Sequence, residues 1–353
     1  MGQLFPRVVG HQGAKEDLRR ALEGGRLAGS FLFLGPEGVG RRLLALELAK
    51  AAVCQGPAQG PRPCGECGFC KRIERGNCGD VVVLQRPEEL TKIPIDTVRE
   101  MIEELGLAPV ECPLRFFVID GAGDLMEETQ NALLKALEEP PPQAVLVLIA
   151  ERADEVLPTI ASRCRVVRLG ELSRPEVCEV LRRAGAPARE VEARARWSSG
   201  SPGRGLREDA LELAEAAREA VALLASGKAR RDPMAAVERL AAFVQPGKGE
   251  SRQQRERVAA LAGALQRVLR DALVLRAGAG GAGGAPGLSG AERGELEALA
   301  RLPEGRLERA LDELARVDEE LARNANVKLL VDGLGLELGR ALAPAQPEEV
   351  GRG

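Results

Sequence analysis

The pattern of hydrophobic and polar positions divides the chain into two parts. In residues 1–170, short apolar runs alternate with helical patterns, which is the signature of a parallel sheet covered by helices. Because buried parallel strands are apolar on both faces, each run predicts a strand. The expected strands are 30–35, 80–85, 115–120, 144–150 and 165–169. Helices are expected at 41–53, 95–105 and 127–137, the last ending before three prolines.

From Ser173 onward the pattern predicts helices alone. Ser173 can cap a helix whose first turn contains Pro175. Longer amphipathic segments follow at 208–226, 233–244, 252–276, 291–300, 304–324 and 327–343. The glycine-rich segment 277–290 separates two of them. We interpret it as a loop inside one bundle, because the helices beyond it are too few to bury a core alone.

The chain length adds a division into domains. A chain of 353 residues exceeds what one hydrophobic core usually supports. We expect an α/β domain over 1–170, a small helical domain over 171–228, a helical bundle over 229–345 and a tail at 346–353.

Composition argues against several classes of protein. A formal net charge of −3 disfavours a free-standing nucleic-acid binder, and the absence of tyrosine together with a single tryptophan disfavours a base-stacking platform. No apolar run approaches the ~18–20 residues of a membrane span. The N-terminus lacks the basic-then-apolar order of a secretion signal. We therefore expect a cytoplasmic protein without a membrane partner.

Residues 35–42 read GPEGVGRR and lie between an expected strand and an expected helix. Backbone N–H groups and the helix dipole favour phosphate at such a place, so Gly35, Gly38 and Gly40 form a candidate phosphate loop. An active loop needs lysine at position 41 to reach the terminal phosphates and serine or threonine at position 42 to hold magnesium. Both positions are arginine, which leaves Arg41 as the phosphate contact of a degenerate loop. A plain strand-to-helix turn and a loop that binds nucleotide without cleaving it stay as alternatives.

Asp120 ends the expected strand 115–120, where a magnesium-associated aspartate usually lies. The next position should carry an acid that orients the attacking water, but it is Gly121. Asp124 lies a full helical turn away and is a poor substitute. We therefore count Asp120 among the degenerate nucleotide contacts and expect no ATP hydrolysis.

Four of the eight cysteines follow the spacing C-x9-C-x2-C-x2-C directly after the expected helix 41–53. Four thiolates can close a tetrahedral shell around zinc, and a closed shell predicts a structural site. The expected ligands are Cys54, Cys64, Cys67 and Cys70, within a module over 54–78. Cys78 could replace Cys54 as the fourth ligand. The other three cysteines more often indicate buried small residues, and His11, the single histidine, a packing role.

The run NALLKALEEPP at 131–141, followed by Ser162-Arg163-Cys164, resembles the AAA+ subunits of bacterial DNA polymerase III clamp loaders. The resemblance is strong over 5–206 and weak over 230–343. It implies a RecA-like AAA+ domain with a zinc insertion, a small helical lid and a helical collar for oligomerisation. It also implies that Arg163 is an arginine finger, which stabilises phosphate charge in a neighbouring subunit's ATP site. Without the flanking run, an ordinary surface arginine would be the better interpretation.

The same resemblance weakens the nucleotide site further. Glu151 stands where hydrolysing members carry a phosphate-sensing threonine, and the sensing arginine of the lid falls on Gly203, with Arg204 one residue away. Among clamp-loader subunits, the delta-prime type has a site altered in this way. The resemblance therefore implies a non-hydrolysing stator in a five-membered ring with delta and tau or gamma subunits, which acts on the sliding clamp and primed DNA through the complex. An ATP-hydrolysing tau- or gamma-type subunit and a zinc-knuckle nucleic-acid-binding protein are the alternatives.

Overall fold

The structure is a computed structural model that describes residues 3–57, 59–87, 90, 92–226, 233–244, 252–278, 291–323 and 325–341. Contacts between residues group the chain into two compact units. The first unit contains residues 1–180 and 201–203, and the second contains residues 181–200 and 204–353. The division into three domains stays a prediction. In the described ranges no helix is both long enough and apolar enough to span a bilayer.

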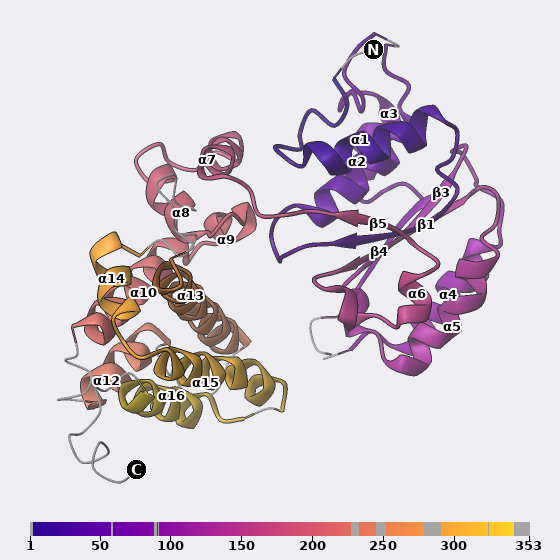
Figure 1. Cartoon of the computed structure of the whole chain (residues 1–353). Helices are drawn as coiled ribbons and strands as arrows, with labels where there is room; N and C mark the ends of the chain where they lie inside the picture. Colours follow the sequence, from indigo (N-terminus) through magenta and orange to yellow (C-terminus); the bar gives the residue numbers. More distant parts are fainter. Residues whose placement is uncertain are drawn as a thin grey trace. The chain divides into compact units, whose positions relative to one another are not determined.

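A five-stranded sheet, in which all pairs are parallel, forms the centre of the first unit (Figure 1). Its strand order is β2-β3-β4-β1-β5. The strands are β1 (Gly29–Leu34), β2 (Val81–Gln85), β3 (Arg115–Asp120), β4 (Ala144–Ala150) and β5 (Arg165–Arg168). Each coincides with an expected strand to about one residue at either end, and the predicted α/β class with a parallel sheet is confirmed.

Successive side chains of the strands pack into two separate cores, one on each face of the sheet. In β1, Phe31 and Phe33 belong to one core and Leu32 and Leu34 to the other. This is the alternation of a strand that is buried on both sides. The first face is covered by α1 (Gln12–Glu23) and α2 (Arg41–Val53), and the second by α4 (Ile95–Leu105), α5 (Glu127–Glu138) and α6 (Pro158–Ala161) (Figure 1).

Short elements connect these layers. They are α3 (Gly68–Glu74) and the single-turn helices η1 (Ala122–Asp124) and η2 (Ala153–Glu155). The three helices expected in this part of the chain are present as α2, α4 and α5, whereas α1 and α3 are not among the expected ones. The apolar periodicity of α1 was available as a signal, since Ala14, Leu18 and Ala21 are buried on one face. By contrast, α3 has 7 residues, which is too short for periodicity to indicate a helix.

A buried carboxylate holds the chain at the entrance to β3. Asp80 is fully buried, and its two oxygens accept backbone N–H groups of Val110 at 2.9 Å, Glu111 at 2.8 Å and Cys112 at 2.9 Å. Burial acts to raise the pKa of Asp80, but these donors and the Arg115 guanidinium outweigh it, so the pKa lies below its ordinary value. The charged carboxylate therefore ties the start of β2 to the segment that leads into β3.

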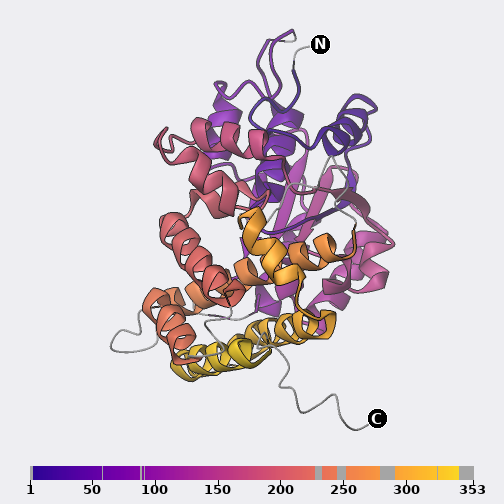
Figure 2. The same cartoon turned by 60° about the vertical axis from the view of Figure 1, so that its left-hand side comes forward.

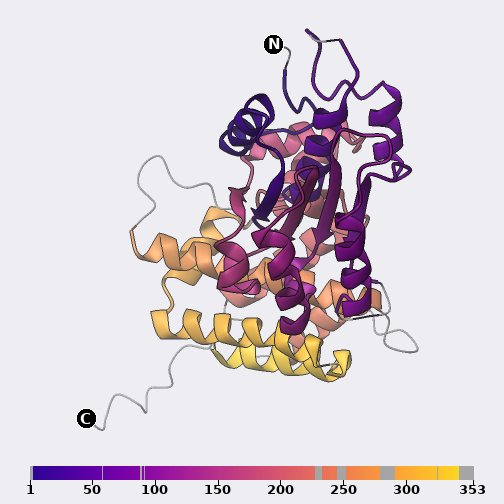
Figure 3. The ribbon, with the colours of Figure 1, turned by 90° about the vertical axis from the view of Figure 1, so that its right-hand side faces the viewer.

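Helices alone follow β5 in the described part of the chain (Figures 1 and 2). They are α7 (Arg174–Arg183), α8 (Val191–Trp197), α9 (Pro202–Leu206), α10 (Ala210–Ala225), α12 (Pro233–Val244), α13 (Arg252–Arg276), α14 (Arg293–Ala300), α15 (Glu304–Ala322) and α16 (Val327–Ala341). Helices α10 and α12 to α16 share one hydrophobic core, and α15 lies alongside α16 (Figure 3).

The helices on either side of the glycine-rich segment contribute to that same core. Ala272 of α13 and Leu299 of α14 are both fully buried in it. The two helices therefore belong to one bundle. Residues 279–290 of the segment, and the expected tail 346–353, lie outside the described residues.

We expect Asp80→Asn to lower the free energy of unfolding at pH 7 by about 1–3 kcal/mol, because an amide NH₂ group then faces backbone donors that have lost their acceptor. The folded pKa is depressed, so the stabilisation is present above the unfolded pKa of about 3.9 and is lost as the pH falls through the folded pKa. Urea denaturation across this pH range measures both effects.

The matched control for this prediction is Asp96→Asn, since the Asp96 side chain is 83% exposed. Its effect should stay within about 0.5 kcal/mol. A gap between wild type and Asp80→Asn that does not shrink below about pH 4 would contradict the role assigned to the charged form.

Candidate functional site

The carboxyl ends of four strands meet at one edge of the sheet. Strand pairing aligns Gln85 with Asp120, Asp120 with Ile149, and Leu34 with Ala150. Gln85, Asp120 and Leu34 are the last residues of β2, β3 and β1, and Ile149 and Ala150 are the last two of β4. The residues that follow these strand ends therefore lie close to segment 35–40, which leads into α2. Open α/β sheets bind ligands at such an edge.

The segment 35–40 has a backbone that requires glycine. Gly35, Gly38 and Gly40 have φ angles of 155°, 76° and 107°, which lie in the region that favours glycine. A Cβ atom on Gly35 would lie 2.1 Å from the carbonyl oxygen of Leu169. The glycines predicted for a phosphate loop are therefore needed by the turn itself.

Three successive carbonyl groups of this segment accept hydrogen bonds from outside it. The Ser201 hydroxyl donates to Glu37 O at 2.6 Å, the Gly203 N–H donates to Gly38 O at 2.9 Å, and His11 Nε2 lies 3.0 Å from Val39 O. A Cβ atom on Gly203 would lie 2.7 Å from Gly38 Cα. Burial lowers the pKa of His11, which favours the neutral ring. Groups of the protein alone thus hold the segment in place, and His11 has the packing role expected of it.

Arg42 and Arg41 both pair with acids at the edge of the sheet. Arg42 Nη1 lies 3.3 Å from Asp120 Oδ2 and donates to Gln85 Oε1 at 2.5 Å. Arg41 Nη2 lies 3.7 Å from Glu151 Oε1, and the Arg41 side chain is only 12% exposed. Both acids therefore have a cationic partner within the protein itself.

The backbone after β3 disfavours any residue that carries a side chain. Gly121 has a φ angle of 101°, and a Cβ atom there would lie 3.0 Å from Asp124 Oδ2. Asp124 itself accepts a hydrogen bond from Arg86 Nε at 3.1 Å. Position 121 thus carries no carboxylate, and the nearby carboxylate of Asp124 is already in an ion pair.

Arg163 lies directly after α6, at some distance along the chain from these groups but in the same unit. Its Nε and Nη2 atoms lie 2.9 Å and 2.6 Å from Oε1 of Glu138, the last residue of α5. Its Nη1 donates to the carbonyl oxygen of Thr159 at 3.0 Å. The side chain is 35% exposed, so the guanidinium is oriented by its own subunit and still reachable from outside.

The four expected metal ligands come together. The Sγ atoms of Cys54, Cys64, Cys67 and Cys70 all lie within 4.8 Å of one another. Backbone N–H groups of Gly56 and Cys64 donate to the Cys54 sulfur, and the N–H of Cys67 donates to the Cys64 sulfur at 3.3 Å. This last bond lowers the pKa of the Cys64 thiol. Sulfur atoms that accept backbone N–H bonds favour the thiolate form, which is the form that binds a metal ion.

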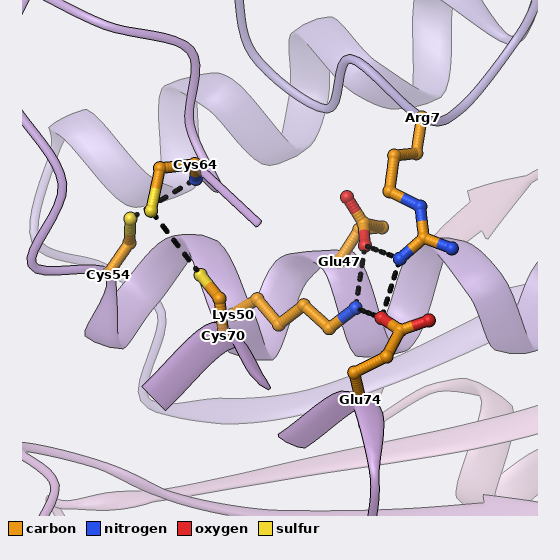
Figure 4. Close-up of polar contacts among 7 residues, drawn as sticks. All are labelled: Arg7, Glu47, Lys50, Cys54, Cys64, Cys70 and Glu74. Carbon is orange, nitrogen blue, oxygen red and sulfur yellow. Dashed lines mark hydrogen bonds and ion pairs between the residues drawn. The ribbon is translucent and has the colours of Figure 1, made fainter. Parts of the chain in front are cut away.

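An ion network anchors the cysteine module to α2 (Figure 4). Lys50 is 3% exposed, and it pairs with Glu47 on its own helix at 3.0 Å and with Glu74 at the end of α3. Arg7 also pairs with Glu74, at 2.5 Å. Because Cys70 lies on α3, this network fixes the helix that carries one of the four thiols.

Cys78 lies in a different environment. Its sulfur is 3.8 Å from that of Cys112, and both residues are buried in the core that includes α1 and α2. Cys178 is also buried, whereas Cys164 is partly exposed. Of the two alternatives for the fourth ligand, the structure brings Cys54 and not Cys78 to the other three.

Comparison with known proteins relates these features to subunits of DNA polymerase III. Residues 10–173 match the family model for the DNA polymerase III delta subunit. The delta' subunit of DNA polymerase III from Pseudomonas aeruginosa is 34% identical over 208 residues, which cover 56% of this chain and 63% of that protein. This part of the chain is therefore similar to the delta and delta' subunits of DNA polymerase III.

Other proteins are similar to this chain as well. The gamma subunit of DNA polymerase III from Buchnera aphidicola is 30% identical over 180 residues, or 51% of this chain. The chain spans only 49% of that subunit's length. A gamma subunit-related protein from Thermotoga maritima superposes with a TM-score of 0.51 at 19% identity, covering 92% of this chain and 99% of that one. This last likeness shows that the fold is shared.

The structure adds three residues that the sequence alone did not indicate. Gln85 pairs with Arg42, Ser201 holds the glycine segment, and Glu138 holds Arg163. Gln85 could have been found, since it ends an expected strand at the same sheet edge as Asp120. Glu138 lies within the run 131–141, but no spacing rule indicates which acid of that run faces Arg163.

We expect Gly203→Ala to lower the free energy of unfolding by about 1–3 kcal/mol, because the added methyl group would overlap backbone atoms of Gly38 that cannot rotate away. Gly170→Ala is the matched control, since its Cβ atom would contact nothing within 4 Å. Urea denaturation of both variants measures the difference. Equal stability of the two would mean that the contact between 203 and 38 does not hold the segment.

Proposed function

We propose that this chain is a non-hydrolysing stator subunit of the DNA polymerase III clamp loader. In this role it donates Arg163 to the ATP site of a neighbouring subunit while the complex loads the sliding clamp onto primed DNA. The observation that carries the proposal is the pairing of Arg42 with Asp120 and of Arg41 with Glu151 at the sheet edge. In these pairs, guanidinium and carboxylate groups of the protein itself neutralise each other at the place where an active site binds magnesium and phosphate.

The first argument concerns the metal ion. A magnesium ion in a nucleotide site is bound through one or two carboxylates together with phosphate oxygens. Here the carboxylate of Asp120 already lies 3.3 Å from a guanidinium group. A divalent cation would have to displace Arg42, whose permanent positive charge would repel it. Asp120 and Arg41 are therefore remnants of a nucleotide site and take no part in catalysis.

The second argument concerns the attacking water. Orienting water for phosphoryl transfer needs a polar side chain close to the terminal phosphate. Gly121 provides none, and its positive φ angle together with the nearby Asp124 carboxylate disfavours any replacement there. Glu151 would add a negative charge beside the phosphate. Hydrolysis in this subunit is excluded by charge as well as by the missing base.

The third argument concerns Arg163, the proposed arginine finger. Arg163 is partly exposed and oriented, and an arginine supplied by a neighbour can raise the rate of phosphoryl transfer by ~10³–10⁵. A subunit that does not itself hydrolyse ATP can thus control ATP hydrolysis in the neighbouring subunit. Tau and gamma subunits of DNA polymerase III are among the relatives and are the proposed neighbours, with delta as a further partner.

In this proposal residues 171–228 form a lid and residues 229–345 form a collar through which the subunits oligomerise.

We also propose that Cys54, Cys64, Cys67 and Cys70 hold a structural zinc ion. The residues fit such an ion, since four sulfur atoms converge within 4.8 Å and two of them accept backbone N–H bonds. When bound, zinc supplies a cross-link between four points of the chain and no catalysis, because all four ligand positions come from the protein. The ion network of Lys50 and Glu74 then connects this module to α2.

The proposed function is tested in the reconstituted complex of this chain with delta, tau or gamma subunits, the sliding clamp and primed DNA. We expect this chain alone to hydrolyse no ATP. Arg163→Ala should slow steady-state ATP hydrolysis of the complex by at least about tenfold, since one finger is lost, while the composition of the complex is unchanged.

Arg152→Ala serves as the control, because Arg152 is 73% exposed and pairs only locally with Asp154. Its complex should hydrolyse ATP at the wild-type rate. Hydrolysis by the isolated chain, abolished by Arg41→Ala, would instead identify an active tau- or gamma-type subunit. Salt-sensitive DNA binding by the isolated chain would favour a zinc-knuckle nucleic-acid-binding protein.

For the zinc proposal we expect about one zinc ion per chain by elemental analysis, as four thiolates form one closed site. Cys54→Ser should lose most of this zinc and lower the midpoint of thermal unfolding. Cys78→Ser should keep the zinc, because its sulfur contacts Cys112 instead. Loss of zinc from Cys78→Ser with retention by Cys54→Ser would assign the fourth ligand the other way.

A further inference from the structure

The guanidinium group of Arg163 is held along one side by a single oxygen atom. A guanidinium has five N–H groups in a rigid planar fork. The Nε and Nη2 atoms form its side edge, and both lie within hydrogen-bond distance of Glu138 Oε1, at 2.9 Å and 2.6 Å. On the other side, Nη1 donates to the Thr159 carbonyl oxygen at 3.0 Å, whereas the Ser162 hydroxyl at 3.5 Å is too far for a strong bond. The plane of the group is thus fixed from both sides.

These contacts leave part of the end of the fork unoccupied. Nη2 carries two N–H groups, one directed along the side edge toward Glu138 and one along the end edge. The acceptors around Arg163 in the described ranges of the chain are Glu138 on Nε and Nη2, and Thr159 and Ser162 on Nη1, so the second N–H group of Nη2 has no acceptor there. Such an N–H group can donate a charge-assisted bond to a phosphate oxygen. Glu138 therefore orients the group and leaves this N–H group of Nη2 for a phosphate.

We propose that Glu138 is the positioning residue of Arg163. This inference rests on the proposed function, since it requires Arg163 to act on a neighbour's phosphate. Glu138 is the last residue of α5, and α5 packs against α6, so its position relative to Arg163 is set by two packed helices. A flexible arginine would lose rotational freedom each time it reached the phosphate, whereas a held one has already lost it. Glu138 raises the turnover of the neighbouring site through Arg163 and does not contact the nucleotide.

The geometry predicts which replacements are tolerated. Both donors of Arg163 go to the same oxygen, Oε1 of Glu138. The amide oxygen of glutamine can occupy that place and accept the same two bonds, whereas alanine removes the acceptor. Positioning by an oxygen atom thus predicts that Glu138→Gln keeps the function and Glu138→Ala loses it. A role that required the negative charge would make the two variants equally defective.

The experiment measures ATP hydrolysis by the reconstituted complex with wild-type chain, Glu138→Ala, Glu138→Gln and Arg163→Ala, over a range of ATP concentrations. We expect Glu138→Ala to lower kcat about tenfold with little change in KM, and Glu138→Gln to stay within about twofold of wild type. In the double variant of Glu138→Ala and Arg163→Ala, the rate should equal that of Arg163→Ala alone, because Glu138 acts only through Arg163.

Glu139→Ala is the matched control, since Glu139 is exposed and adjacent and its side chain has no ion-pair partner among the described residues. Thermal unfolding and the subunit composition of each complex separate a folding defect from a catalytic one. The inference is overturned if Arg163→Ala slows hydrolysis while Glu138→Ala does not, or if Glu138→Gln is as slow as Glu138→Ala. If Arg163→Ala itself has no effect, the proposed function fails and not merely the part assigned to Glu138.

Discussion

Parallel pairing of the strands determines where the charged groups at the carboxyl edge of the sheet lie. Because β3, β4 and β1 run in the same direction and in register, Asp120, the residue after Ala150 and the glycine segment after Leu34 reach the same edge. The strands are buried on both faces, so a shift of the register by one residue would move each side chain into the opposite core, which is packed for different side chains. The arginines at the start of α2 therefore face Asp120 and Glu151. The pairing of charges at this edge is thus set by the register of the strands.

The arginines at positions 41 and 42 place two permanent positive charges at the start of α2. A guanidinium cannot lose its charge and cannot bind a metal ion, so it serves as a permanent counter-ion for the acid beside it. Asp120 and Glu151 are two carboxylates at one edge, and each lies beside one of these guanidinium groups. The arginines thus stabilise the edge in the absence of nucleotide, while the hydrogen bonds from His11, Ser201 and Gly203 hold the glycine segment.

Away from this edge, the first unit depends on buried charged groups that each have a partner. Lys50 lies between Glu47 and Glu74, and Asp80 accepts three backbone N–H groups. Removing one partner from such a group leaves a buried charge uncompensated, which costs more than the pair contributes. These groups hold α3 against α2 and hold the segment before β3. The cysteine module is therefore attached to a rigid frame even though its own chain has little regular structure.

The sequence by itself determined the elements with strong periodicity and the chemistry of individual positions. Apolar runs placed the five strands, helical spacing placed α2, α4 and α5, and the residues at 41, 42 and 121 predicted a degenerate nucleotide site, because these signals are local. Only the tertiary structure decided which of Cys54 and Cys78 joins the other thiols, that Gln85 meets Arg42, and that Glu138 holds Arg163. Each of these pairings joins residues separated by at least six and up to several tens of positions, and their distance is set by the packing of the helices and strands that carry them. Spacing along the chain carries no information about such distances, and this is the physical reason why the partners of Arg163 and Arg42 could not be read from the sequence.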